Sequence, residues 1–227
     1  MKTGLAMMGV AFLLLAASGA RARDWDDDFA VREPVVRQAG HYEWNWDGSD
    51  GLTLAIPATT RYTPAGSPRI VITASDDFLS HVRVGDGRIR MERGWRNRDN
   101  ERAQVTITGV TVHNITLAGS GRVTLEKLDL DRLHLTLAGS GALSGDGRAG
   151  ELDLSVAGSG DSDLARLAVR RANIHIAGSG SVRLTPRDEA HLSVAGSGTV
   201  RMAARPPRLS QSIIGSGGVR IDGEQNR

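Results

Sequence analysis

The stretch LAGSG occupies residues 117–121 and returns along the chain at a nearly constant spacing. The further copies are LAGSG at 137–141, VAGSG at 156–160, IAGSG at 176–180, VAGSG at 194–198 and the divergent IIGSG at 213–217. Their central serines stand 20, 19, 20, 18 and 19 residues apart. A period near 20 residues is typical of solenoids, in which each repeat stacks on the next.

The residues around each copy alternate between apolar and polar. Leu133, Leu135 and Leu137 lie at alternate positions leading into one copy of the motif. Val182 and Leu184 lie at alternate positions just after another copy. Period two indicates β-strands with one buried face, and no segment shows the spacing of an amphipathic helix. The sequence therefore predicts an all-β fold, a β-helix of at least six coils with about 19–20 residues per coil.

Each copy carries two glycines, and the alternation assigns them a place in the coil. Counting from an inward Leu137 puts Gly139 and Gly141 on the inner side and Ser140 outside. We therefore expect the motif to form a corner whose interior has no room for a Cβ, with serines stacked outside. The twelve corner glycines are Gly119, Gly121, Gly139, Gly141, Gly158, Gly160, Gly178, Gly180, Gly196, Gly198, Gly215 and Gly217.

The first residues have the features of a secretory signal peptide. Lys2 precedes an apolar run from Leu5 to Ala17 that is too short to span a bilayer, and small residues follow. Cleavage fits after Ala20 or after Ala22. We assign residues 1–22 to the signal peptide, 23–50 to an N-terminal segment that is a candidate cap, and 51–227 to the β-helix domain, with repeats from about 110.

Cysteine content and net charge limit the classes of function. The chain has no cysteine, hence neither a disulfide framework nor a lipidated N-terminal cysteine. Loss of Lys2 and Arg21 with the signal peptide leaves 26 basic residues against 26 acidic ones. A neutral chain lacks the net basic character of nucleic-acid-binding proteins, and no segment of the mature chain is apolar enough to be a transmembrane helix.

The tandem hydrophobe-x-hydrophobe-Ala-Gly-Ser-Gly units resemble the head GIN domain family of putative auto-transporter adhesins. The resemblance extends from about Leu52 to Ile221. It implies a right-handed β-helix exported to the bacterial periplasm, cell surface or medium, with an adhesin-like, structural or binding role and no catalysis. An autotransporter also carries a C-terminal translocating domain, and none follows the last coil, so we expect the resemblance to cover the domain and not self-translocation.

Less regular strands are expected before the repeats. They cover 52–56, 69–73, 82–84, 88–91 and 105–108, and a charged loop, RGWRNRDNERA, runs from 93 to 103. Because no long Pro/Gly/Ser linker separates them from the repeats, we interpret them as irregular first coils of the same domain.

One outward column suggests a binding site. Aligned on the corners, it reads Thr124, Ser144, Asp163, Arg183, Arg201 and Arg220. Two interpretations stay open. The long side chains extend into water, with Asp163 paired to Arg183; or Arg183, Arg201 and Arg220 form a track for the phosphates, sulfates or uronates of acidic envelope polysaccharide.

Other candidate sites are weaker. Tyr42, Trp44 and Trp46 form either a cap over the core or a stacking site for a ligand. Asp161 and Asp163 share a face, as the carboxylates of a polysaccharide-active enzyme could. Histidines in two further columns could bind a metal only across different coils. These columns read Asn114, His134, Asp153, Asn173, His191 and Thr116, Thr136, Ser155, His175, Ser193. We expect no catalysis, no cofactor and no metal; the partner, whether polysaccharide or another envelope protein, stays open.

Overall fold

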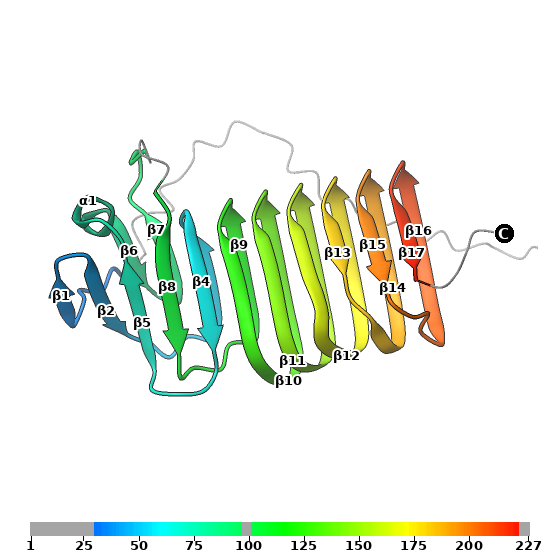
Figure 1. Cartoon of the computed structure of the whole chain (residues 1–227), viewed down its shortest axis with the longest axis horizontal. Helices are drawn as coiled ribbons and strands as arrows, with labels where there is room; N and C mark the ends of the chain where they lie inside the picture. Colours follow the sequence, from blue (N-terminus) through cyan, green and yellow to red (C-terminus); the bar gives the residue numbers. More distant parts are fainter. Residues whose placement is uncertain (1–29, 97–100, 223–227) are drawn as a thin grey trace, which may run out of the picture.

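The computed structural model describes residues 30–96 and 101–222, so the expected signal peptide and its cleavage sites lie outside the described residues. The chain is nearly all β and forms a solenoid of about five turns, which confirms the predicted fold class. Figure 1 shows the strands side by side along the long axis, with the earliest strands at one end and β16 and β17 at the other. The six corners delimit about five complete turns, one fewer than expected, because the last corner is followed by a single short strand.

The repeat coils stack in parallel and in register. For example, Leu137 pairs with Leu117 on one side and with Val156 on the other. The strands of this region are β9 (Asn114–Gly119), β10 (Arg122–Gly139), β11 (Ala142–Gly158), β12 (Asp161–Gly178), β13 (Ser181–Arg183), β14 (Pro186–Gly196), β15 (Thr199–Met202), β16 (Arg208–Gly215) and β17 (Gly218–Ile221).

Each long strand bends twice between corners. In β10 the buried residues are Val123, Leu125, Leu128, Leu130, Leu133, Leu135 and Leu137. The alternation slips by one residue at 126–127 and again at 131–132, which turns the chain around the core. We call the surface at 122–125 and its stacked equivalents the post-corner face, and the surface at 132–138 and its equivalents the pre-corner face.

The interior of the repeats is almost purely aliphatic. Stacked inward positions repeat Leu or Val from coil to coil, so each coil buries the side chains of its neighbours. Ser162 interrupts one such column between Leu143 and Val182, and its hydroxyl has no hydrogen-bond partner within the described chain.

The N-terminal region departs from chain order. β3 (Gly51–Ala55) and β4 (Ala58–Thr63) stack on β9 and β10. The later strands β7 (Arg88–Met91) and β8 (Ala103–Thr108) stack on the far side of β3 and β4. Two irregular coils thus lie in the reverse of their order in the sequence.

Antiparallel strands cover this end of the core. β6 (Val82–Gly85) pairs with β7, and β5 (Arg69–Thr73) pairs with β8. β2 (His41–Asn45) pairs with β5, and β1 (Val36–Gln38) pairs with β2. The five expected strands are present, whereas β1, β2 and β4 were not expected.

A short helix was also not predicted from the sequence. α1 (Asp76–Ser80) begins at Ser75, whose hydroxyl accepts a hydrogen bond from the backbone N–H of Phe78. Five residues are too few to display a helical period in the sequence.

At the corners, the structure agrees with the expected position of one glycine and differs for the other. Gly141 is buried, and a Cβ there would lie 2.8 Å from the carbonyl oxygen of Gly121, as the crowded interior predicts. Gly139 instead is half-exposed with φ +119°, and its Cβ would lie 2.6 Å from the carbonyl oxygen of Gly119. The placement of Gly139 inside was therefore wrong. It is needed because the backbone there is left-handed and because the coil beneath approaches closely.

Hydrogen bonds continue from coil to coil through the corners. The backbone N–H of Ser140 donates to Gly119 at 3.0 Å, and that of Ser159 donates to Gly139 at 2.9 Å. The serine side chains stand exposed outside. The glycine carbonyl that excludes a Cβ is thus also the acceptor that joins consecutive coils.

Candidate functional site

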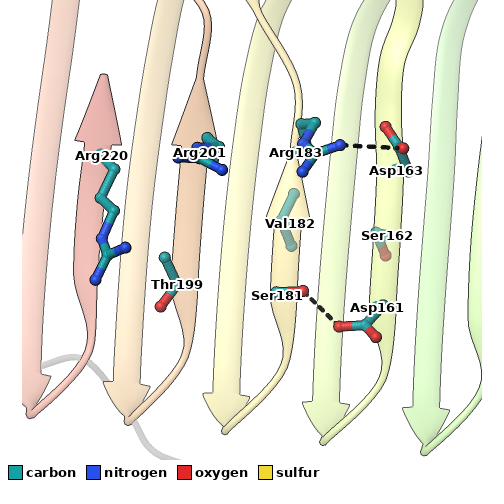
Figure 2. A pocket seen from close by; sticks show the side chains of 9 residues that line it. All are labelled: Asp161, Ser162, Asp163, Ser181, Val182, Arg183, Thr199, Arg201 and Arg220. Atoms are coloured by element: carbon teal, nitrogen blue, oxygen red, sulfur yellow. Dashed lines mark hydrogen bonds and ion pairs between the residues drawn. The ribbon is translucent and has the colours of Figure 1, made fainter. Parts of the chain in front are cut away.

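The post-corner face gathers the arginines that the sequence aligned. Asp163 pairs with Arg183, Arg183 with Arg201, and Arg201 with Arg220, on β12, β13, β15 and β17. Figure 2 shows the three arginines on successive strands, beside Asp163. Because neighbouring strands lie about 4.8 Å apart, the three arginines leave the sheet at about this spacing along the solenoid axis.

Two of these arginines have carboxylate partners. Arg183 Nη1 lies 3.6 Å from Asp163 Oδ2, and Arg201 Nε lies 3.2 Å from Asp222 Oδ1. All four side chains are about half exposed, so each pair contributes little stability and can exchange partners. Arg220 makes no ion pair with any described residue, which leaves its guanidinium open to an external anion.

A shallow concavity of about 360 Å³ lies over this column. Its lining residues are Asp161, Ser162, Asp163, Ser181, Val182, Arg183, Thr199, Arg201 and Arg220. The acidic residues occupy one end, on β12, and the arginines the other. Ser181 and Thr199 precede Arg183 and Arg201 by two residues on the same strands, in a row that begins with Asp161 (Figure 2). Guanidinium and hydroxyl donors on one surface can hold the oxygens of a phosphate, sulfate or uronate.

The carboxylates in this concavity are poorly suited to catalysis. A glycosidase keeps one of its two carboxyl groups protonated, commonly by burial. Asp161 and Asp163 are both exposed. The hydroxyl of Ser181 donates a hydrogen bond to Asp161, and Arg183 pairs with Asp163.

The aromatic cluster lies at the covered end of the core. Trp44 is buried, and its indole N–H donates to the carbonyl of Arg32 at 3.0 Å. The indole of Trp46 donates to the carbonyl of Ser49 at 3.1 Å, and the guanidinium of Arg37 lies 5.1 Å from the centre of the Tyr42 ring. These rings pack on the protein itself. A hollow of about 330 Å³ beside Tyr42 and Trp44 is lined by both charged and aliphatic side chains, and these two are the only aromatic rings among its described lining residues.

Asp47 fastens the loop that follows this cluster. Burial alone would raise its pKa, but hydrogen bonds from Ser49 and from the backbone N–H of Gly87 outweigh that effect and lower the pKa below its usual value. The carboxylate therefore ties the loop to the turn between β6 and β7.

The pre-corner face carries charges of alternating sign. Its column reads Arg132, Glu151, Arg171, Glu189 and Arg208. Glu151 lies 3.1 Å from Arg132 and 3.5 Å from Arg171, and Glu189 lies 3.2 Å from Arg208.

The histidine columns occupy the same face, in the register expected from the sequence. His134 lies 3.0 Å from Asp153, which also accepts a hydrogen bond from Asn173 at 2.7 Å. Across residues 30–96 and 101–222, no three metal-ligating side chains come together. The carboxylates of this face are occupied by neighbouring side chains.

Two charged residues that extend or adjoin the arginine column were not predicted from the sequence. Arg61 on β4 extends the column, since it pairs with Thr124, but its place depends on the reversed order of the first coils. Asp222 lies just beyond the last strand, where no further repeat indicates its direction. In the sequence, only the alternation of apolar and polar residues after Gly217 indicated that strand, β17.

The fold and the face together define the class of architecture, a β-solenoid that presents columns of aligned side chains on flat surfaces. A family model described as "Putative auto-transporter adhesin, head GIN domain" matches residues 50–206. The chain belongs to this family, as the corner motifs suggested.

Solved structures share the fold. A putative adhesin from Bacteroides fragilis is 19% identical, with a TM-score of 0.64, over 80% of this chain and 95% of that one. A putative adhesin from Parabacteroides distasonis is 18% identical, with a TM-score of 0.52 and the same coverage. No curated protein matches the chain. Within the described residues, no helix has the length and apolar character needed to cross a membrane.

Proposed function

We propose that the chain is an exported module of the bacterial cell envelope that binds other molecules without catalysis. Family membership and the names of its structural neighbours support an adhesin-type role. The fold offers flat, exposed surfaces, and the concavity over the arginine column is shallow, which suits contact with a polymer or a protein better than enclosure of a small substrate.

We propose further that the post-corner face binds acidic envelope polysaccharide through Arg183, Arg201 and Arg220. The observation that supports this proposal is their register in three consecutive coils, over a concavity that is also lined by the hydroxyl of Thr199. A polymer lying along the axis meets one arginine per coil. Its acidic groups compete with Asp163 and Asp222, both exposed, for Arg183 and Arg201.

Binding of alginate and of lipopolysaccharide to the mature chain tests this proposal. We expect an affinity that falls steeply as sodium chloride rises, since the contacts are exposed charge pairs. Changing Arg183, Arg201 and Arg220 together to glutamine should abolish binding and preserve the β-sheet circular dichroism spectrum.

A matched control changes Arg132, Arg148 and Arg170 to glutamine. These exposed arginines lie on the other faces of the repeat coils, and their replacement removes the same net charge. Equal loss in both triple variants would assign the effect to net charge and refute the site. A shortened polymer recovered from the mixture would refute the non-catalytic assignment, and retention in the cytoplasmic fraction would refute export.

A further inference from the structure

Charge is segregated along the axis of the solenoid. Between residues 164 and 222 stand nine arginines, no lysine and three acidic residues. Between 122 and 163 the balance reverses, with eight acidic residues and four basic ones. The neutral total of the mature chain therefore conceals a basic end beside an acidic middle.

The nine arginines surround this end rather than follow one face. They are Arg166, Arg170, Arg171, Arg183, Arg187, Arg201, Arg205, Arg208 and Arg220, and all are exposed. Arg220 stands on the post-corner face, Arg208 on the pre-corner face, and Arg205 in the segment that joins β15 to β16. A polymer along one face meets about a third of them. A flat surface placed across the end of the solenoid lies close to the arginines on all faces of the last coil. The arginines of the preceding two coils lie within about 10 Å of that surface, one Debye length at moderate salt.

The same end exposes apolar side chains. Ile213 and Ile214 on β16 are 37% and 71% exposed, and they are the only exposed large hydrophobic residues of the described repeat coils. Val219 and Ile221 of β17 are only partly buried. Among the described strands, β16 pairs only with β14 and β17 only with β15, so no strand covers the core here, in contrast to the opposite end.

We infer that the C-terminal end of the solenoid docks end-on to an anionic lipid surface. Arginines around the rim pair with lipid phosphates, and Ile213 and Ile214 enter the boundary between head groups and acyl chains. Cationic residues around an apolar tip are the combination that membrane interfaces favour. Docking in this orientation leaves Arg183 and Arg201 accessible to a polymer, and Arg220 belongs to both surfaces, so the two proposals can fail separately.

Co-sedimentation of the mature chain with vesicles tests the inference. We expect binding to vesicles of phosphatidylcholine mixed with phosphatidylglycerol, little binding to phosphatidylcholine alone, and loss of binding as salt rises. The end variant Arg205→Gln, Arg208→Gln, Ile214→Ser should partition to the anionic vesicles about tenfold more weakly or worse, since each rim arginine contributes severalfold.

The matched control is Arg69→Gln, Arg83→Gln, Val35→Ser, which removes the same charge and one exposed aliphatic side chain at the opposite end. It should bind as the parent does. Equal binding by the end variant and the parent, with both folded by circular dichroism, would overturn the inference. The inference would also be overturned if vesicle binding were lost only when Arg183, Arg201 and Arg220 are changed. It would be overturned as well if the parent bound acidic polysaccharide but no vesicles, and that result would leave the polysaccharide site supported.

Discussion

The two ends of the solenoid are built from different chemistry. From β9 onward, order in space follows order in the chain, glycine turns every corner, and the core is aliphatic. Before β9 the coils are reversed, antiparallel strands are added, and Trp44, Tyr62 and Phe78 fill the core. Repetition can extend a stack but cannot begin one. The first coils therefore rely on large rings and on specific polar contacts, while the repeats rely on close approach of identical backbones.

The largest expected effect tests this close approach. Gly139→Val should lower the free energy of unfolding by about 4 kcal/mol, because a branched side chain would meet the carbonyl of Gly119 and the backbone there is left-handed. Urea denaturation measures the loss, and Gly178→Val, at φ +128°, should behave alike. A loss below about 1 kcal/mol would show that the corners tolerate side chains.

Tyr62→Phe probes the polar contacts of the other region. The Tyr62 hydroxyl donates to the carbonyl of Val110 at 2.8 Å and accepts from the N–H of Val112 at 3.1 Å, in the buried core. Its removal leaves both backbone groups without that partner, at a cost of about 2 kcal/mol near neutral pH.

The same substitution has a pH signature. Burial raises the pKa of Tyr62 above its ordinary value of 10.0, although the hydrogen bond from Val112 opposes the shift. Its contribution to stability is therefore complete below pH 10.0 and is lost as the pH rises through the folded-state value. The difference in stability between the parent and Tyr62→Phe should narrow in alkaline buffer. A constant difference would contradict the buried, neutral phenol.

Gly119 stands at the junction of the two regions and should behave unlike the later corner glycines. Its φ is +99°, but nothing lies within 4 Å of a Cβ placed there. The preceding corner is formed by residues 56–58, between the pairs Leu54–Leu117 and Thr59–Arg122. Gly119→Ala should therefore cost about 1 kcal/mol, from backbone strain alone. Gly139→Ala should cost clearly more in the same thermal unfolding assay, and equal losses would mean that strain alone governs the corners.

The smallest expected effect belongs to the serines. Ser140→Ala should cost about 0.5 kcal/mol or less, because its exposed hydroxyl has water available and its backbone hydrogen bond to Gly119 is retained. A loss as large as that of Gly139→Val would show that serine hydroxyls, rather than glycine backbones, join the coils.

Periodicity explains how far the sequence could predict this structure. Once the corners are aligned, every outward column follows, including the register of Arg183, Arg201 and Arg220. The reversed coils carry no repeat, so nothing local shows that β7 and β8 lie outside β3 and β4. The role of Gly139 was also out of reach, because alternation gives a direction to each side chain but not the backbone twist at a corner. The pairing of Arg183 with Asp163 follows from the aligned column, whereas the partner of Arg201 is Asp222, which lies beyond the last strand, where no further repeat indicates its direction.

The alternating column on the pre-corner face bears on how the chain avoids misfolding. Near-identical corners offer each coil several equally shaped places to stack, a hazard of repeat proteins. If one coil were skipped, Arg132 would meet Arg171 and Glu151 would meet Glu189, instead of the opposite charges that adjoin in the native stack. Like charges on neighbouring strands repel. Repulsion within this column therefore disfavours misfolded stacks in which an odd number of coils has been left out.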